Sequence, residues 1–215
     1  MTKTVLQLND GVIARGAEAL ISQVSITIET GEIALLTGPN GSGKSTLLTA
    51  LAGERFLSSG TLLIDSTLRS ELSLKELAKR RSLMLQQDEA VDQLRVKDVL
   101  ELVDISTELT QYPLDFASQI VDAELREKTL GSLSVGQRTR VFLAASAIQN
   151  SKVMLLDEPT AGLDVDAVTL LSEFLIAHTS NGGAVILATH EDTLRSIASK
   201  EFVILDGRLI VRKLG

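Results

Sequence analysis

Residues 33–51 read IALLTGPNGSGKSTLLTAL, and this stretch decides the fold that we predict. The uninterrupted apolar run from Ile33 to Thr37 is typical of a strand that is buried on both faces of a parallel sheet. Beyond the glycines, Leu47 and Leu51 recur at helical spacing, and Gly53 supplies a stop signal. The stretch therefore predicts a strand, a glycine-rich loop and a helix in direct succession.

The loop, Gly38-Pro39-Asn40-Gly41-Ser42-Gly43-Lys44-Ser45, matches the phosphate-binding pattern G-x-x-x-x-G-K-[ST] at every fixed position. Glycines allow successive backbone N–H groups to curl around phosphate oxygens, and the N-terminus of the following helix adds partial positive charge. We expect Lys44 to contact the β- and γ-phosphates of a nucleotide and Ser45 to coordinate Mg²⁺, with Thr46 also in the nucleotide-binding set. A glycine-rich turn before an ordinary helix is the alternative.

A second apolar run, Val153-Met154-Leu155-Leu156, ends in Asp157-Glu158. Carboxylates at the end of a buried strand lie at the edge of the sheet where α/β proteins bind ligands. We expect Asp157 to hold Mg²⁺ with its water shell and Glu158 to act as the general base that polarises an attacking water. The pattern by itself also fits a solvated helix cap, but the upstream phosphate-binding loop favours the site.

The N-terminal third predicts an antiparallel β layer. Asn9-Asp10-Gly11 is a turn signal, and we expect it to join two short strands, Val5–Leu8 and Val12–Ala14, in a hairpin. Apolar residues alternate with polar ones from Val24 to Ile28, which indicates a half-buried strand.

The C-terminal half alternates helices and strands. Apolar residues with a period of 3.6 predict helices at Ser134–Ile148 and Ala167–Ala177, and the apolar run Ala184–Thr189 predicts another parallel strand. Asp206-Gly207 is the turn of a closing hairpin, and we expect no C-terminal regulatory domain after it.

The strand signal disappears between about residues 66 and 132. Ser73-x-x-Glu76 opens a helix as a capping box, and an apolar helical face recurs from Val96 to Val103. We therefore expect a single domain over residues 1–215, with a mostly helical insertion subdomain at about 66–132.

Charge and composition exclude several classes of protein. The formal net charge of −7 argues against nucleic-acid binding, which depends on clustered Lys and Arg. The chain has no cysteine, so disulfides and thiolate metal sites are excluded. No run approaches the roughly 20 apolar residues of a membrane-spanning helix, and Met1 to Asn9 lacks the features of a secretion signal.

The segment Leu133-Ser134-Val135-Gly136-Gln137 allows two interpretations. Ser134 and Gln137 fit a capping box for the helix that follows, and this structural role alone accounts for both. It does not account for Gly136, since glycine in a first helical turn costs about 0.5–1 kcal/mol relative to alanine. A helix N-terminus that carries Ser and Gly is also a good phosphate receptor.

These motifs and their order resemble those of the ABC ATPase family, and the resemblance extends from about Val5 to Val211. In chain order they are the loop Gly38–Ser45, Gln86 in Leu85-Gln86-Gln87, the signature Leu133–Gln137, Asp157-Glu158, Ala161-Gly162-Leu163-Asp164, and His190. The resemblance implies an α/β P-loop NTPase fold with a mixed core sheet, an antiparallel N-terminal β layer and a helical subdomain. Another P-loop family, such as the nucleotide kinases, is the alternative.

The resemblance further implies that two copies pack head to tail around two molecules of Mg-ATP. One subunit would supply the phosphate-binding loop together with Gln86, Asp157, Glu158 and His190. The other would supply Ser134, Gly136 and Asp164, with Gln137 beside them. His190 would then bind the γ-phosphate, while Gln86 would ligate Mg²⁺ and report the nucleotide state to the helical subdomain. Gln87 competes with Gln86 for that role.

Two positions depart from the family pattern. Many members carry Gly where this chain has Val135, and an aromatic residue that usually stacks on adenine is missing from Val12 to Leu20. Arg15 falls near that place, and a guanidinium plane can stack on a base. An exposed charge on a loop is the alternative for Arg15.

The activity implied is ATP hydrolysis that drives separate membrane-spanning subunits, with the chain on the cytoplasmic face of the cell membrane. The alternative is a non-transport ABC ATPase of DNA repair, chromosome organisation or translation. Long coiled-coil insertions mark the chromosome-associated proteins and two cassettes in one chain mark the translation factors, and neither pattern occurs in this sequence. The transported substrate and its direction are not encoded in these motifs.

Overall fold

The computed structural model describes residues 2–15, 18–85, 92–103 and 111–214. The strands are β1 (Thr4–Arg15), β2 (Glu18–Glu29), β3 (Ile33–Thr37), β4 (Ser59–Ile64), β5 (Thr67–Leu68), β6 (Arg81–Met84), β7 (Val153–Asp157), β8 (Ala184–Ala188), β9 (Lys200–Leu205) and β10 (Arg208–Lys213). The α-helices are α1 (Lys44–Leu51), α2 (Leu74–Arg80), α3 (Val96–Val103), α4 (Gln111–Ile120), α5 (Ala123–Arg126), α6 (Val135–Ile148), α7 (Val165–Ser180) and α8 (Asp192–Ser196). Two 3₁₀ turns, η1 (Arg69–Glu71) and η3 (Leu130–Ser132), connect them.

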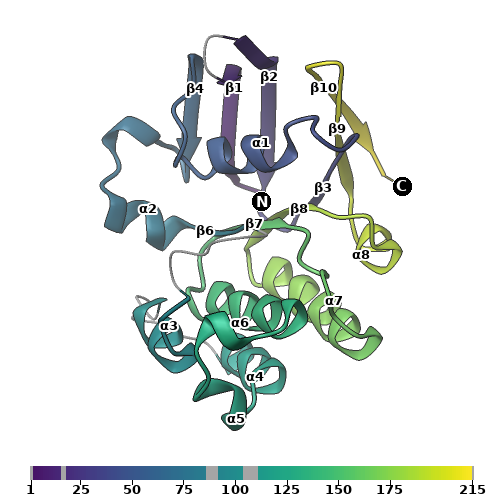
Figure 1. The fold of residues 1–215 in the computed structure, drawn as a ribbon. Helices are drawn as coiled ribbons and strands as arrows, with labels where there is room; N and C mark the ends of the chain where they lie inside the picture. The colour runs from purple at the N-terminus through teal and green to yellow at the C-terminus, as the bar shows by residue number, and fades with distance from the viewer. Residues whose placement is uncertain (1, 16–17, 86–91, 104–110, 215) are drawn as a thin grey trace.

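The described strands form two sheets (Figure 1). The first is antiparallel, in the order β2-β1-β4-β5, and the second has the order β10-β9-β3-β8-β7-β6. In the second sheet β3 pairs in parallel with β8 and β9, β7 pairs in parallel with β6 and β8, and β9 pairs with β10 antiparallel. The predicted mixed core sheet and antiparallel N-terminal layer are both confirmed.

The continuous apolar runs are explained by burial on both faces of the second sheet. Along β3, Ala34 and Leu36 join the core shared with the antiparallel sheet and α1, whereas Ile33 and Leu35 join a second core on the helical side. β7 and β8 divide their residues between the two cores in the same alternating way. Helix α1 therefore lies between the two sheets, where it carries the end of the phosphate-binding loop (Figure 1).

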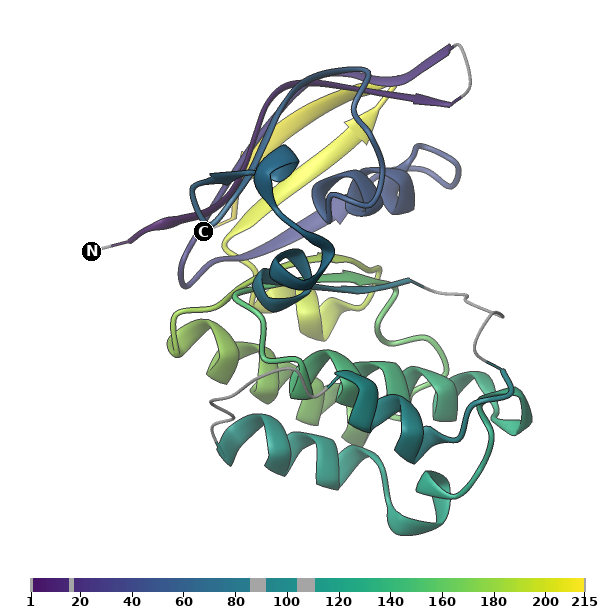
Figure 2. The same cartoon turned by 90° about the vertical axis from the view of Figure 1, so that its left-hand side faces the viewer.

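The helices α3 to α7 form a helical layer on the other side of the core sheet, in which α6 and α7 contact the sheet and α4 packs beneath them (Figure 2). Phe116 of α4 stacks on Phe174 of α7, with ring centroids 4.2 Å apart. Because α3, α4, α6 and α7 share one apolar cluster with β3, β7 and β8, the helical layer and the sheet are packed through a common core.

The predicted N-terminal hairpin is wrong. Asn9-Asp10-Gly11 lies inside β1, which pairs with β2 along its whole length, from Thr4 opposite Glu29 to Arg15 opposite Glu18. Asp10 has φ 49°, and the register shifts on both sides of Gly11, so the turn signal encodes a β-bulge. A bulge and a tight turn both need a residue that tolerates positive φ, and the sequence does not distinguish them.

The expectation of no strand between residues 66 and 132 is wrong in its first part. Two strands lie there, β5 and β6, and β6 extends the core sheet by pairing in parallel with β7. Its sequence, Arg81-Ser82-Leu83-Met84, is not a run of apolar residues. A buried strand can begin with the charged Arg81 because this side chain has hydrogen-bond partners in the fold. The guanidinium donates to the Ala52 carbonyl at 2.7 Å and to Glu54 at 2.8 Å.

Several local predictions are confirmed. Ser73 and Glu76 form the capping box at the start of α2, and Asp206-Gly207 closes the β9–β10 hairpin with φ 48° and 70°. None of the helices described is both long and apolar enough to cross a lipid bilayer.

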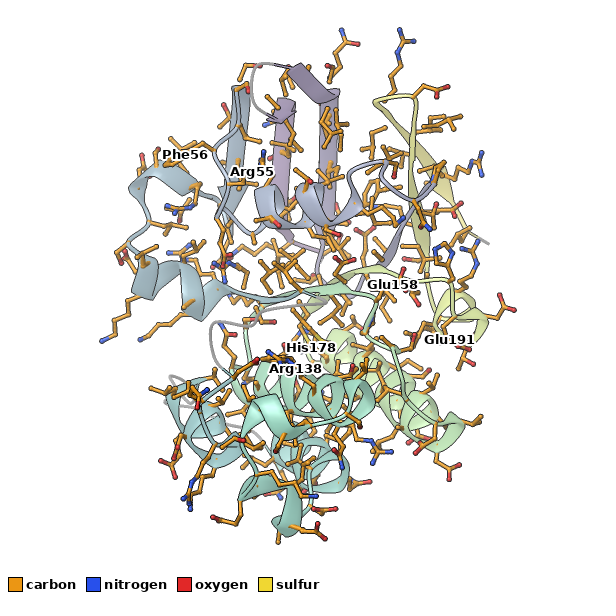
Figure 3. The ribbon with its side chains drawn as sticks, in the orientation of Figure 1. Arg55, Phe56, Arg138, Glu158, His178 and Glu191 are labelled. Carbon is orange, nitrogen blue, oxygen red and sulfur yellow. The ribbon has the colours of Figure 1, made fainter. Side chains whose placement is uncertain are left out.

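His178 of α7 is buried in the helical layer (Figure 3), with a relative exposure of 3%. Its Nδ1 lies 3.2 Å from the Tyr112 hydroxyl, and its buried Nε2 has no hydrogen-bond partner among the described residues. Gly183 packs so closely that a Cβ there would lie 2.2 Å from Nε2. Burial disfavours the charged ring and lowers the pKa of His178 from 6.5 to about 4.

This burial predicts a loss of stability in mild acid. In the unfolded chain the His178 ring takes up a proton below pH 6.5, whereas in the folded chain it does so only near pH 4. The contribution of this ring to the unfolding free energy is therefore fully present above pH 6.5 and decreases as the pH falls from 6.5 to about 4. We expect His178 to account for about 2 kcal/mol of the decrease in unfolding free energy between neutral pH and about pH 5. Urea titrations of wild type and His178→Gln at both pH values measure it. His190→Gln, at a mostly exposed histidine, is the control, and an equal acid effect in wild type and His178→Gln contradicts the assignment.

Candidate nucleotide-binding site

The predicted phosphate-binding loop connects the end of β3 to the start of α1. Gly38, Gly41 and Gly43 have φ of 147°, 80° and 102°, which is backbone that L side chains rarely adopt. Gly43 is the N-cap of α1 and offers no capping side chain. The first N–H groups of α1 therefore point out of the helix without a side-chain acceptor, as an anion-binding helix N-terminus requires.

Lys44 folds back over this loop. Its Nζ donates to the carbonyl oxygens of Gly38 at 2.9 Å and Pro39 at 3.3 Å. Pro39 also accepts from the Ser42 backbone N–H, and the Ser42 hydroxyl is buried without a hydrogen-bond partner in the described chain. Among the described residues, the ammonium group thus donates to the carbonyls of Gly38 and Pro39.

The loop and the two predicted carboxylates line one cavity of about 290 Å³. Its lining consists of Asn40, Gly41, Gly43, Lys44, Ser45, Asp157 and Glu158. β3 and β7 run parallel on either side of β8, so their carboxyl ends reach the same edge of the sheet. The topology therefore brings together two motifs that lie more than a hundred positions apart in the sequence.

Glu158 occupies a strained position in this cavity. It follows the last residue of β7 with φ 48°, and its backbone N–H donates to the Ala188 carbonyl at 2.8 Å. A non-glycine residue in this conformation costs of order 1–3 kcal/mol, and such residues cluster at active sites. The chain therefore maintains an unfavourable backbone geometry to present this carboxylate.

The environment of Glu158 raises the pKa of its carboxyl group. Partial burial raises its pKa and the neighbouring carboxylate of Asp157 raises it further, while His190 and Lys44 lower it. Asp157 itself is buried, with 5% exposure. His190 is mostly exposed and its Nε2 lies 3.7 Å from Glu158, so the structure brings His190 to the rim of the same site.

The signature segment does not line this cavity in the same chain. Ser134 is exposed and caps α6 in a complete capping box with Gln137, as the structural interpretation predicts. The structure also gives Gly136 a packing role: a Cβ there would lie 2.1 Å from the Gly162 carbonyl oxygen. The absence of a side chain at 136 is therefore explained within one chain, without a phosphate.

Asp164 also has partners in its own chain. It caps α7 by accepting from the Ala167 N–H at 2.8 Å, and it pairs with Arg140 of α6. Thr139 donates to the Ala161 carbonyl at 2.8 Å, so α6 contacts the 161–164 segment at three points. Thr139 and Arg140 were not predictable from the sequence, because neither belongs to a motif and their partners are over twenty positions away.

Three predicted positions fall outside the described parts of the chain. Gln86 and Gln87 lie in the range 86–91, and the Arg15 side chain is likewise outside the description although its backbone ends β1. Thr46 lies in the first turn of α1, next to Ser45.

The sequence and the fold were compared with known proteins. The family model described as "ABC transporter" matches residues 21–161. The hemin import ATP-binding protein HmuV of Rhodococcus jostii is 31% identical over 205 residues, with 92% of this chain and 70% of that protein covered. The cytochrome c biogenesis ATP-binding export protein CcmA of Gluconobacter oxydans is 34% identical over 189 residues, with 86% and 81% covered.

Solved structures share the fold at lower identity. The dimeric ATP-binding cassette MJ0796, bound to ADP and Pi in a post-hydrolysis state, aligns with a TM-score of 0.84 and 23% identity over 98% of this chain and 99% of that one. An ATP-binding subunit of an ABC transporter aligns with a TM-score of 0.86 and 20% identity, over 98% and 90%.

The close approach of Gly136 and Gly162 predicts that Gly136→Ala destabilises the protein even though alanine is the better helix former. The backbone carbonyl cannot move aside easily, so overpacking should cost about 3 kcal/mol against the roughly 1 kcal/mol gained in helix propensity. We expect a net loss of about 2 kcal/mol in urea unfolding without nucleotide. Val135→Ala, at an exposed site in the same turn, should stay within about 0.5 kcal/mol of wild type. An equally stable Gly136→Ala protein contradicts the packing role.

Proposed function

The chain belongs to the ABC transporter family, and we propose that it is an ATPase subunit that hydrolyses Mg-ATP in a head-to-tail dimer and so drives separate membrane-spanning subunits. One observation carries the proposal: a single cavity unites the phosphate-binding loop with Asp157 and Glu158. ATP hydrolysis requires the phosphates, the metal ion and the attacking water to bind next to one another, and this cavity brings the residues proposed for all three together.

The loop binds the phosphates of ATP. Its backbone N–H groups and the uncapped start of α1 supply oriented donors, and Lys44 supplies a full positive charge. The contacts of Lys44 with the Gly38 and Pro39 carbonyls keep its ammonium near this position before ATP arrives. On binding, Nζ exchanges these contacts for the β- and γ-phosphate oxygens.

The donors in the cavity fit Mg²⁺. Ser45 and Asp157 offer a hydroxyl and a carboxylate, the hard oxygen ligands that Mg²⁺ prefers, and this ion usually completes its shell with substrate phosphates and water. Among the described residues, no group of three or more His, Cys, Asp or Glu side chains could hold a metal ion. When bound, Mg²⁺ neutralises charge on the β- and γ-phosphates. Gln86 is a further proposed ligand.

Glu158 is the proposed general base. Its raised pKa makes it a better proton acceptor than a surface carboxylate, while Lys44 and His190 help to keep it ionised. It accepts a proton from the water whose oxygen attacks the γ-phosphorus, and the bond from that phosphorus to the β–γ bridging oxygen breaks to release ADP. His190, whose Nε2 lies 3.7 Å from Glu158, is the residue proposed to bind the γ-phosphate.

The position of the α6 N-terminus supports the dimer. The N-terminus of α6, with Ser134 exposed, lies outside the cavity, and a second copy packed head to tail would bring its own Ser134 and Gly136 to the γ-phosphate. Asp164 and Gln137 of that copy would lie beside them. The dimeric state of a cassette with the same fold supports this arrangement.

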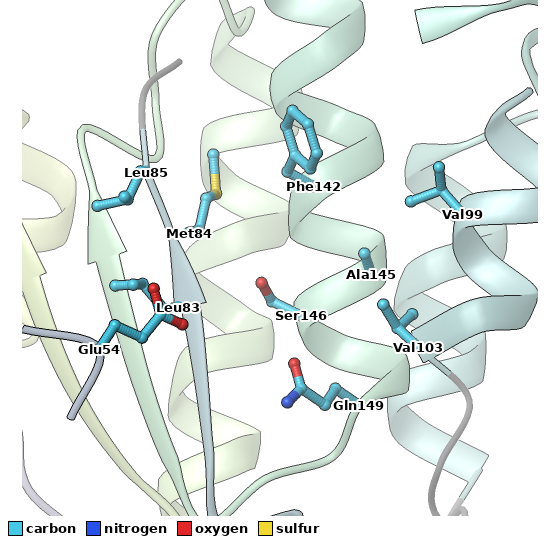
Figure 4. Close-up of a pocket in the computed structure, with 10 residues that line it drawn as sticks. All are labelled: Glu54, Leu83, Met84, Leu85, Val99, Val103, Phe142, Ala145, Ser146 and Gln149. Carbon is cyan, nitrogen blue, oxygen red and sulfur yellow. The ribbon is translucent and has the colours of Figure 1, made fainter. Parts of the chain in front are cut away.

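A groove supports docking to a membrane-spanning partner. It has a volume of about 250 Å³ and runs between β6 on one side and α3 and α6 on the other (Figure 4). Its walls are Glu54, Leu83, Met84, Leu85, Val99, Val103, Phe142, Ala145, Ser146 and Gln149. Because this lining is mainly apolar with polar groups at one end, it suits a short helical segment of a partner, through which the chain is held on the inner face of the membrane.

The nature of the transported substrate stays outside the proposal. HmuV is named for hemin import and CcmA for export in cytochrome c biogenesis, so the two relatives differ in direction. Substrate specificity in such an assembly resides in the membrane-spanning subunits. Arg15 remains the proposed residue for stacking on adenine.

Glu158→Gln separates binding from turnover. The amide keeps the size of the side chain but cannot accept the proton, so the hydrolysis rate should fall by roughly 10²- to 10⁴-fold while Mg-ATP still binds. The variant should elute as a monomer without nucleotide and as a dimer with Mg-ATP. Phosphate release and size-exclusion chromatography measure the two effects.

Lys44→Ala is the matched control, because it should lose ATP binding and the dimer together. Near-normal phosphate release by Glu158→Gln would refute the catalytic assignment. A variant that stays monomeric while it binds Mg-ATP would refute the head-to-tail dimer instead.

A further inference from the structure

Glu201 carries a buried carboxylate that the proposed reaction does not use. Its side chain on β9 is 8% exposed, and burial of a charge is costly unless partners compensate for it. Three side chains surround the carboxylate, and they come from three separate elements. Two of those elements, β3 and α8, are next in the chain to segments of the nucleotide site.

The first partner is Thr37, the last residue of β3. Its hydroxyl donates to Glu201 Oε1 at 3.0 Å, and the next residue is Gly38, where the phosphate-binding loop begins. β9 also contacts Gly38 itself, since a Cβ there would lie 2.5 Å from the Ile204 carbonyl oxygen. The start of the loop is therefore fixed against β9 by the Glu201 side chain and by backbone packing.

The second partner is Arg195 of α8. Its guanidinium donates to the same Oε1 at 3.4 Å, so one oxygen atom accepts from both β3 and α8. Only Glu191 separates His190 from the start of α8, and Glu191 caps this helix. The backbone N–H of Glu191 also donates to the Thr189 hydroxyl at 3.1 Å. The position of α8 thus sets the position of the His190 backbone.

We propose that Glu201 is a positioning residue that fixes the phosphate-binding loop and the His190 segment relative to each other. The inference rests on the proposed ATPase function. Glu201 does not line the nucleotide cavity. It acts through Thr37 on phosphate binding and through Arg195 on the position of His190.

The third partner provides a control. Arg212 of β10 lies 3.6 Å from Oε2, and its side chain is mostly exposed. β10 is the edge strand of the core sheet and leads into neither catalytic segment. Removal of Arg212 therefore takes one positive charge away from the Glu201 carboxylate but leaves the contacts of Glu201 with Thr37 and Arg195 in place.

Five variants test the proposal in the full chain, with ATP turnover and Mg-ADP binding as readouts. Thr37→Val removes only the hydroxyl contact and should raise the Kd for Mg-ADP and the KM for ATP about 3- to 10-fold, with kcat changed less than about twofold. Thr37→Ser should restore wild-type values. Arg195→Met should lower kcat about 3- to 10-fold with KM nearly unchanged, because it disturbs only the His190 side. Glu201→Gln should show both effects, and Arg212→Met should show neither.

This division between KM and kcat distinguishes positioning from a structural role. If Thr37→Val and Arg195→Met lower only the melting temperature and keep both kinetic constants within about twofold of wild type, Glu201 is structural and the proposal is wrong. Both substitutions leave the Glu201 carboxylate in place, so the test does not depend on whether Glu201→Gln folds. A wild-type chain that neither binds Mg-ADP nor turns over ATP refutes the proposed function itself.

Discussion

The parallel pairing of β3, β8 and β7 is the constraint on which the rest of the structure depends. It aligns the carboxyl ends of β3 and β7 at one edge, where a lysine and two carboxylates meet across a single cavity. Burial of both faces of these strands holds the edge in place, since their side chains alternate between the two cores. The strained backbone at Glu158 is tolerated because the sheet on one side and the α6 contacts on the other fix the chain around it.

Much of the core was predictable from the sequence, for reasons that lie in local patterns. Runs of apolar residues marked β3, β7 and β8, and the glycine and lysine spacing of the phosphate-binding loop left little freedom in how it connects strand to helix. β6 was not predictable, because its charged first residue finds partners only after Ala52 and Glu54 come close in the fold. The bulge at Asp10 was mistaken for a turn because both conformations use the same residues, and only the pairing partner decides between them.

The structure also changes how the signature segment is understood. Ser134, Gly136 and Asp164 each have a complete role in their own chain, as a cap, a close packing contact and a cap with an ion pair. The contacts at Gly136 and Asp164 join α6 to the segment that follows Glu158, and the Glu158 carbonyl accepts from the Ala161 N–H at 3.1 Å. In the proposed dimer, the N-terminus of α6 would face the nucleotide of one site. The same helix contacts the segment that follows Glu158, which is the proposed general base of the other site. A role in the chain and a role across the dimer are compatible, because the capping contacts leave Ser134 exposed.

The central claim is that the backbone of residues 38–46 binds the phosphates of a nucleotide at the edge where β7 ends. Amide hydrogen exchange, measured with and without Mg-ADP, tests it most directly because it reports on the N–H groups themselves. We expect slower exchange at Gly41 to Thr46 when Mg-ADP is bound, and no such change in Lys44→Ala. Unchanged exchange across this loop, at a concentration of Mg-ADP that stabilises the protein against unfolding, would contradict it.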